Sequence, residues 1–67
     1  MQNGTVEWFD LDKGYGFIKP EDGSEDIFVH ISEVERAGHS TLSNDQAIKY
    51  ELQNKHGKLS ATNIELV

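Results

Sequence analysis

Ring-bearing side chains recur at alternate positions in two short segments of the sequence. Tyr15 and Phe17 stand two residues apart in the first segment, and Phe28 and His30 stand two residues apart in the second. Because successive side chains of a β-strand point to opposite faces, each pair shares one face of its strand. Exposed rings on a sheet can stack with unpaired bases, at about 1–3 kcal/mol per base, whereas a duplex hides its base faces. The spacing therefore predicts a surface that binds single-stranded nucleic acid.

The opposite faces of the same two segments carry aliphatic side chains. Ile18, Ile27 and Val29 can be buried without leaving a polar atom unpaired, whereas a phenol and an imidazole need water or a partner. We therefore expect the aliphatic face to form the core and the ring-bearing face to be exposed. A single strand phenylalanine is more often a core residue, but four rings in phase opposite an aliphatic face favour an exposed cluster.

Neighbouring residues could extend this surface. Trp8 is ambiguous, because strict alternation places it in the core, while a strand bend after Glu7 would turn it outward. Gly14 and Gly16 would keep the backbone low beside the rings, so that a nucleic-acid strand could lie close. Lys13 could meet a phosphate at the edge of the surface.

The elements that would position these rings are strands. Five runs are rich in β-branched, aromatic or alternating apolar residues, three before a long connection and two after it. The second run ends at Pro20, which cannot donate to a sheet. The expected strands cover residues 5–9, 15–19, 26–31, 47–52 and 59–66. Their count and order predict an all-β fold, a five-stranded antiparallel Greek-key barrel of the oligonucleotide-binding (OB) type.

The two later strands and the connection before them carry weaker signals. Residues 32–36 could form one helical turn capped by Ser32, and residues 37–45 are typical of a loop. In the fourth strand Ile48, Tyr50 and Leu52 alternate with polar residues, as expected of a half-buried strand.

In the last strand the parity of the apolar residues shifts between Ala61 and Ile64, which indicates a bulge.

Length and composition bound the class of protein. The chain has 67 residues, enough for one domain over residues 1–67, and a fold of this size buries only about 60% of the unfolded surface. With no cysteine and three histidines, neither a disulfide nor a structural zinc site is expected. No apolar run approaches the roughly 20 residues of a membrane span, and no signal peptide opens the chain. We expect a cytoplasmic monomer that makes no membrane contact and has no metal, cofactor or small-molecule substrate.

The formal net charge of −6, from 12 acidic and 6 basic residues, argues at first against a nucleic-acid partner. Six of the 12 acids, however, are expected to lie away from this surface: Glu21, Asp22 and Glu25 in the turn before the third strand, and Glu33, Glu35 and Asp45 in the long connection. The candidates for a local positive rim are Lys13, His30, Lys55, His56 and Lys58. Stacking of bases on the rings, more than pairing of lysines with phosphates, must then bind the nucleic acid. The logarithm of affinity should fall with log salt at a shallow slope of about −1 to −3.

Two motifs resemble those of a known family. Residues 13–18, Lys-Gly-Tyr-Gly-Phe-Ile, resemble the first ribonucleoprotein motif of the cold-shock domain, and residues 27–30, Ile-Phe-Val-His, resemble the second. The opening residues 4–9 and the closing residues 61–64 are also similar, so the likeness covers nearly the whole chain. The chain is identified as a bacterial single-domain member of this family. The resemblance implies an OB barrel that binds single-stranded RNA or DNA with weak sequence preference and acts as an RNA chaperone, with effects on transcription and translation.

The family motifs also imply which residues bind. The implied binding residues are Trp8, Lys13, Tyr15, Phe17, Phe28 and His30, with Trp8 turned outward. We add His39, at a loop position where the family often has an aromatic ring, and Lys58 from the positive rim. Four positions depart from the family: Ile31 and His39 replace frequent aromatic rings, Glu7 replaces a lysine and Asp10 an asparagine. These changes predict weaker binding than that of a typical member at equal salt.

Other functions are less well supported by the same residues. A protein-interaction barrel of the SH3 type is also small, all-β and acidic, with an aromatic groove for proline-rich peptides. The rings here stand in mid-strand with His30 and glycines among them, which favours nucleic acid. A translation-factor barrel of the same fold would bind ribosomal RNA but should differ in the paired motifs. An enzyme is least expected, because no nucleophile–base set or metal cluster is visible; His30 with Asp26 or Ser32 is better explained as a ligand contact beside turn residues.

Overall fold

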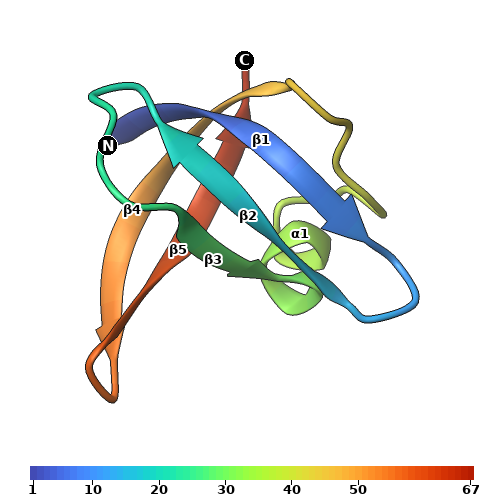
Figure 1. Cartoon of the computed structure of the whole chain (residues 1–67). Helices are drawn as coiled ribbons and strands as arrows, with labels where there is room; N and C mark the ends of the chain where they lie inside the picture. The colour runs from blue at the N-terminus through green and yellow to red at the C-terminus, as the bar shows by residue number, and fades with distance from the viewer.

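The chain forms five strands and one short helix in a computed structural model (Figure 1). The structure describes residues 1–67 apart from the side chain of Lys55. The elements are β1 (Gln2–Asp10), β2 (Tyr15–Pro20), β3 (Ile27–His30), α1 (Ile31–Arg36), β4 (Ala47–Lys55) and β5 (Lys58–Leu66). All five predicted strands are present. β1 and β4 are longer than expected, and β3 is shorter.

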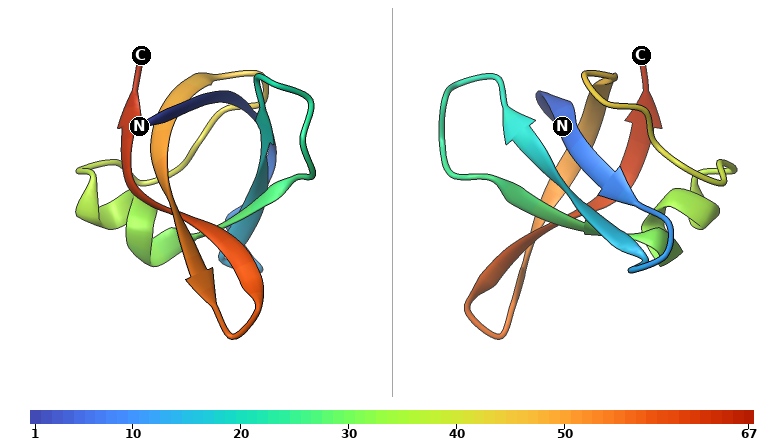
Figure 2. Two further views of the ribbon diagram at one scale, coloured as in Figure 1. Left: turned by 90° about the vertical axis from the view of Figure 1, so that its left-hand side faces the viewer. Right: turned by 45° about the vertical axis from the view of Figure 1, so that its right-hand side comes forward.

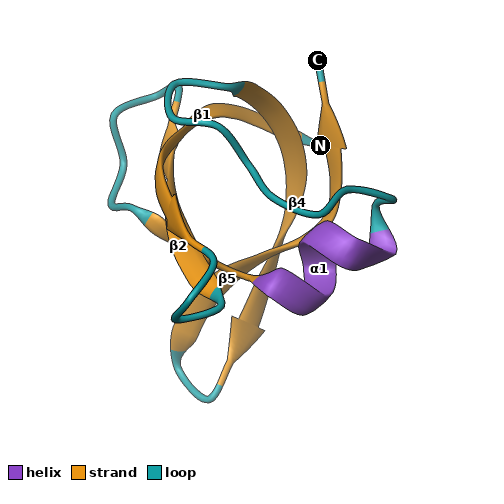
Figure 3. Cartoon of the chain, turned by 90° about the vertical axis from the view of Figure 1, so that its right-hand side faces the viewer, coloured by secondary structure: helices purple, strands orange, loops and turns teal.

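The strands close into a barrel in the order β1-β2-β3-β5-β4 (Figures 1 and 2). β1 pairs with β2 on one side and with β4 on the other, and these pairings and those of β2–β3 and β4–β5 are antiparallel. β3 meets β5 in a short parallel contact between Phe28 and Ser60. Figure 3 shows the strands curving around the interior, with α1 beside β3 and β5. The predicted all-β five-stranded barrel is confirmed, with one parallel contact at its closure.

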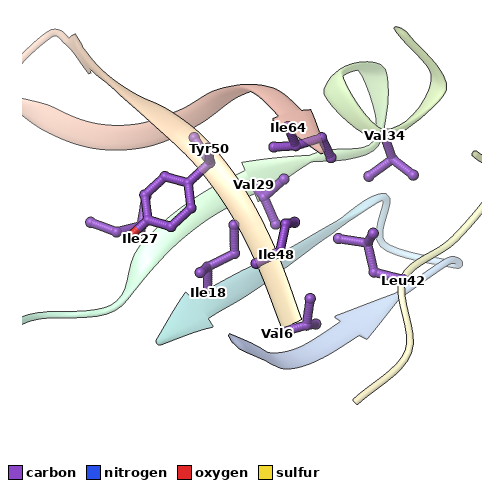
Figure 4. Close-up of a cluster of buried hydrophobic side chains, with 10 residues drawn as sticks. Val6, Ile18, Ile27, Val29, Val34, Leu42, Ile48, Tyr50 and Ile64 are labelled. Atoms are coloured by element: carbon purple, nitrogen blue, oxygen red, sulfur yellow. The ribbon is translucent and has the colours of Figure 1, made fainter. Parts of the chain in front are cut away.

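Aliphatic side chains fill the interior of the barrel (Figure 4). The buried hydrophobic residues of the core are Val6, Ile18, Ile27, Val29, Val34, Leu42, Ile48, Tyr50, Ala61 and Ile64. Ile18, Ile27 and Val29 are each at most 2% exposed, so the predicted core face of β2 and β3 is confirmed. Each such side chain contributes about 1.5–3 kcal/mol by leaving water. Burial also raises the pKa of Tyr50, and the charge of Asp22 adds to this effect.

The far end of the β4–β5 hairpin projects beyond the barrel (Figure 1). Leu52, predicted to share a buried face with Ile48 and Tyr50, is 46% exposed, and so is Leu59. Leu52 lies opposite Ala61, so it does continue the inner face of the strand. The predicted alternation is therefore correct, but the predicted burial of Leu52 is wrong, because among the described residues no further strand packs against the inner face of the hairpin at its projecting end.

The predicted bulge in the last strand is present. The pairing of β4 with β5 shifts by one residue between Lys49 and Glu51, which leaves an extra residue in β5. Asn63 adopts a φ of 49° there. As a result Ala61 and Ile64 both face the core, although they are three positions apart.

The helix α1 begins one residue earlier than the sequence predicted, at Ile31, and its N-cap is His30. The His30 backbone is still extended, with φ −95° and ψ 151°, and its ring accepts a hydrogen bond from the backbone N–H of Ser32. Ser32 is thus the donor to the cap, and the prediction that Ser32 itself caps the helix is wrong. Ile31, expected to end the third strand, is the first helical residue because the cap lies directly at the end of β3.

Gly16 lets β1 and β2 approach closely. A Cβ at this position would collide with the carbonyl oxygen of Trp8 and lie 2.7 Å from the Cα of Phe9. Gly16 is buried, so the expectation that it keeps a path open for a ligand is wrong; it makes room for the neighbouring strand. Gly14 lies in the β1–β2 turn with a φ of 78°, a conformation that favours glycine.

Candidate nucleic-acid interface

Five rings from β1, β2 and β3 form one cluster on the outer side of the sheet. We call this cluster the aromatic platform, and its members are Trp8, Tyr15, Phe17, Phe28 and His30. Strand pairing brings the rings together, because Tyr15 lies opposite His30, and Phe17 lies opposite Phe28 on one side and Trp8 on the other. Neighbouring ring centroids are 5.4–6.4 Å apart. The predicted placement of these rings on one face is confirmed.

The rings of the platform support one another. Tyr15 and Phe28 are stacked at 5.5 Å with 30° between their planes. Phe17 meets Phe28 at 76° and Tyr15 at 88°, both edge-on arrangements. Such pairs are each worth about 0.5–1.5 kcal/mol beyond the burial of their surface. The rings are therefore ordered before any ligand arrives, and a ligand that stacks on them loses little affinity to side-chain ordering.

The platform is open to solvent on its outer side. Trp8 is 36% exposed and His30 is exposed, while Tyr15, Phe17 and Phe28 are half-buried against the sheet and one another. Partial burial of this kind holds a ring in place and leaves part of its π-face accessible. The platform can thus stack with flat aromatic groups such as unpaired bases.

A β-bulge at Glu7 turns Trp8 outward. Val6 pairs with Ile18 and Trp8 pairs with Phe17, so β1 contains one extra residue between two consecutive pairs. The extra residue reverses the alternation of the strand, and Val6 is fully buried while Trp8 joins the platform. Alternation alone left the orientation of Trp8 open, and the outward position implied by the family resemblance is the one observed.

A groove extends from the platform toward the β4–β5 hairpin. Its lining includes Phe17 and Phe28 on the platform and Gln53, Lys58 and Ser60 on the hairpin strands. Glu25 and Glu33 also line the groove, so the expectation that these two acids lie away from the surface is wrong. The groove exists because the barrel closes through the parallel β3–β5 contact, which brings Ser60 beside Phe28. Gln53 and Ser60 were not among the residues predicted from the sequence. Only the strand order of the closed barrel signals them, since they are distant from the ring motifs in the sequence.

Basic side chains are few around the platform. Lys13 is exposed in the β1–β2 turn, and Lys58 lies in the wall of the groove. His56 is exposed in the turn of the β4–β5 hairpin, and the side chain of Lys55 lies outside the described residues. His39 is exposed in the loop after α1 and forms none of the ring pairs found among the described residues. The structure thus brings Lys58 next to the platform but not His39.

Two carboxyl groups, from Glu7 in the bulge and Asp26 before β3, interact with each other beside the platform. The pKa of Glu7 is raised by a hydrogen bond with the Asp26 carboxyl, by partial desolvation and by the negative charge of Asp26, while Lys19 lowers it. Negative charge on these groups opposes the approach of a phosphate to this edge. Repulsion between these carboxylates and phosphate groups therefore disfavours a nucleic-acid backbone at this edge of the platform.

Among the described residues, no group of three or more His, Asp or Glu side chains could hold a metal ion. Nor does any described helix combine the length and the apolar character needed to cross a bilayer. The hydrogen bond of 3.0 Å between His30 Nδ1 and Ser32 Oγ belongs to the cap of α1.

The fold and the platform together define an OB-type barrel with an exposed aromatic face. The chain matches the model of the family described as 'Cold-shock' DNA-binding domain over residues 2–67. It therefore belongs to the cold-shock domain family. Members of this family bind nucleic acid and are not enzymes, so the SH3-type and enzymatic alternatives no longer apply.

Named relatives agree with this assignment. The chain is 57% identical over 67 residues to "Probable cold shock protein y4cH" of Sinorhizobium fredii, covering 97% of each protein. It is 50% identical over 66 residues to "Cold shock protein CspA" of Rhizobium meliloti, covering 96% of each. It is 46% identical over 61 residues to "Cold shock-like protein CspE" of Escherichia coli K12, covering 91% of this chain and 88% of the relative.

Proposed function

We propose that this protein binds single-stranded RNA and DNA by stacking unpaired bases on the aromatic platform. The observation that carries the proposal is the cluster of five ordered, solvent-facing rings on the outside of the barrel. Stacking on protein rings is worth about 1–3 kcal/mol per base and tolerates any sequence, because every base has a π-face. A duplex keeps its bases stacked inside, so it is expected to bind much more weakly.

The proposed binding residues have three kinds of role. The full set is Trp8, Lys13, Tyr15, Phe17, Phe28, His30, His39 and Lys58. The five members of the platform stack with bases. Lys13 and Lys58 pair with phosphates, and the position of Lys58 in the groove next to Phe28 supports this role. His39 belongs to the proposed set because of its loop position alone. It contacts a single-stranded nucleic acid that is long enough to extend past the platform.

In the cell the protein acts as a passive RNA chaperone. Because it binds the open strand and not the paired one, binding shifts the hairpin equilibrium toward the unpaired form by mass action and needs no ATP. Such an activity serves cold adaptation and influences transcription and translation, since low temperature stabilises hairpins. We further propose that residues 1–67 act as a single cold-shock domain, as a monomer, in the cytoplasm.

Fluorescence of Trp8 provides the test, because it is the single tryptophan and lies in the platform. The protein is titrated with a single-stranded oligonucleotide, with the duplex of the same sequence and with a proline-rich peptide. We expect quenching by the single strand only. Equal binding of the duplex would contradict stacking on the platform, and a response to the peptide alone would contradict nucleic-acid binding through this face.

Chaperone activity is tested separately with an RNA hairpin that carries a fluorophore and a quencher at its ends. At low temperature and without ATP, the protein is expected to raise the open fraction in proportion to its concentration. Phe28→Ala is the matched variant, because it removes a ring that contacts Tyr15, Phe17 and His30 and leaves the core intact. Opening that requires ATP would contradict the passive mechanism. Opening by Phe28→Ala that equals that of the wild-type protein would contradict the role of the platform.

A further inference from the structure

His30 belongs to two parts of the molecule at once. Its ring is a member of the aromatic platform, 6.4 Å from the ring of Phe28, and lines the groove. The same ring caps α1, where Nδ1 lies 3.1 Å from the backbone nitrogen of Ser32 and 3.0 Å from the Ser32 hydroxyl oxygen. One side of the imidazole is thus fixed to the helix, and the other side is available to a ligand.

The cap determines which ring nitrogen carries the proton. A backbone N–H can only donate, so the Nδ1 atom that accepts it from Ser32 has no proton of its own. The Ser32 hydroxyl must then also donate to Nδ1, because an unprotonated nitrogen has nothing to give. In the neutral ring the proton therefore sits on Nε2, which lies on the side of the ring away from Nδ1 and Ser32.

We infer that Ser32 is a positioning residue for single-strand binding, because it holds the His30 ring as the Nε2–H tautomer with that donor presented to the ligand. This inference rests on the proposed function and deepens it. The Nε2–H group can donate to an acceptor oxygen of the strand, a phosphate oxygen or a base carbonyl, while the ring face remains available for stacking. Ser32 lines the same groove as His30 and Phe28, so the three side chains act in one place.

We expect Ser32 to affect the affinity for single strands by holding the ring of His30, and not by stabilising the barrel. Ser32 is exposed and its side chain is outside the core. In Ser32→Ala the backbone N–H still caps the ring, but the second donor is lost and the ring gains freedom to turn or to change tautomer. The loss of one neutral hydrogen bond predicts weaker binding of a single-stranded oligothymidylate by about two- to tenfold.

Nitrogen-15 spectra of the histidine rings test the tautomer in the free protein, at about pH 8.5, where an ordinary histidine is neutral. Wild-type His30 should show the Nε2–H form, and Ser32→Ala should show a mixture or exchange broadening. Ser32→Thr, which keeps the hydroxyl, should restore both the spectrum and the affinity. Ser43→Ala is the control, because the hydroxyl of Ser43 makes no hydrogen bond among the described residues. Thermal unfolding checks that each variant folds.

A double variant separates positioning from a purely structural role. His30→Asn keeps a side-chain oxygen for the cap but removes the ring. If Ser32 acts through the ring, Ser32→Ala should weaken oligothymidylate binding in the wild-type background and not in the His30→Asn background.

Three results would overturn the inference while single-strand binding remains intact: an Nδ1–H tautomer in the wild-type protein, unchanged binding by Ser32→Ala, or equal losses in both backgrounds. Failure of the wild-type protein to bind any single strand would instead overturn the proposed function, and the binding role of Ser32 with it.

Discussion

Phe17 belongs to the aromatic platform, where its ring contacts those of Trp8, Tyr15 and Phe28. We expect Phe17→Ala or Phe28→Ala to cost about 1–3 kcal/mol of single-strand binding each, because a stacking partner for one base is lost. Folding should be largely kept, since both rings lie outside the core. Fluorescence titration measures the affinity, and urea unfolding measures the stability.

Leu52→Ala is the matched control for these variants, because Leu52 is an exposed apolar side chain that is not part of the platform or the groove lining. It should bind as the wild-type protein does. Normal binding by either phenylalanine variant would show that the exposed ring face is not the binding face.

The contribution of Glu7 to the free energy of unfolding falls as the pH rises, whereas that of a typical carboxyl group, whose pKa is lowered on folding, grows. Its pKa is raised in the folded protein by the hydrogen bond with Asp26, by desolvation and by the charge of Asp26. Its contribution to stability is therefore fully present below its ordinary pKa of 4.5 and is lost as the pH rises through the raised value. Glu7→Gln should be more stable than the wild-type protein at pH 7, and the difference should shrink as the pH falls toward 4.5. Thermal unfolding across this range measures it.

The same substitution bears on binding. Removing the Glu7 charge at pH 7 should tighten single-strand binding by about two- to fivefold at low salt, because an exposed charge acts modestly and is screened. Glu65→Gln, which removes an exposed charge outside the platform and the groove lining, is the control. Equal gains from both variants would show that net charge alone is responsible and not the position of Glu7.

At the scale of elements, the platform depends on how tightly β1 packs against β2. Gly16→Ala would force a Cβ into the carbonyl of Trp8 and the ring and backbone of Phe9. We expect a loss of about 1–3 kcal/mol of unfolding free energy, as for other overpacked sites, and a displaced Trp8. Urea unfolding monitored by Trp8 fluorescence measures both effects.

Gly23→Ala separates this packing effect from the general cost of losing a glycine. Gly23 has a φ of 81°, and a Cβ there would meet nothing within 4 Å, so its replacement carries only the backbone strain of about 1–2 kcal/mol. Gly23→Ala should leave the emission of Trp8 unchanged. An unchanged Trp8 signal in Gly16→Ala would contradict the role of Gly16 in placing β1.

At the scale of the whole molecule, the net charge of −6 limits how much of the affinity comes from phosphate contacts. Few counterions are released when only a few lysines meet phosphates, so log affinity should fall with log salt at a slope of about −1 to −3. Titration of a single-stranded oligonucleotide over a salt series gives the slope. A steep dependence would contradict a binding mode dominated by stacking.

Departures from the family pattern predict weaker binding than that of a member with aromatic residues at the positions of Ile31 and His39. Ile31 is the first residue of α1, and His39 is in the loop behind it, so neither adds an aryl ring to the platform. Asp10 accepts hydrogen bonds from the amides of Asp12 and Lys13, which ties its charge to the β1–β2 turn. A side-by-side titration at equal salt measures the difference. Equal or tighter binding by this protein would contradict the prediction.

Local periodicity was enough to predict four of the five rings of the platform. The rings of Tyr15, Phe17, Phe28 and His30 face outward because alternation is a property of the strand backbone and needs no knowledge of the partner strands. The core face of Ile18, Ile27 and Val29 followed by the same argument, since aliphatic side chains lose nothing polar on burial. The number of strands and the bulge in β5 could also be read directly from the sequence.

Only the tertiary structure decided features that depend on which strands meet. The bulge that turns Trp8 outward is a mismatch between β1 and β2, and the groove wall at Ser60 exists because β5 closes the barrel against β3. Leu52 lies on the inner face of β4, as alternation predicts, but it is exposed, because burial also requires another strand to pack against that face. The cap at His30 likewise arises where β3 ends against α1. Side-chain alternation is set within one strand, whereas register, closure and burial are relations between segments that are distant in the sequence.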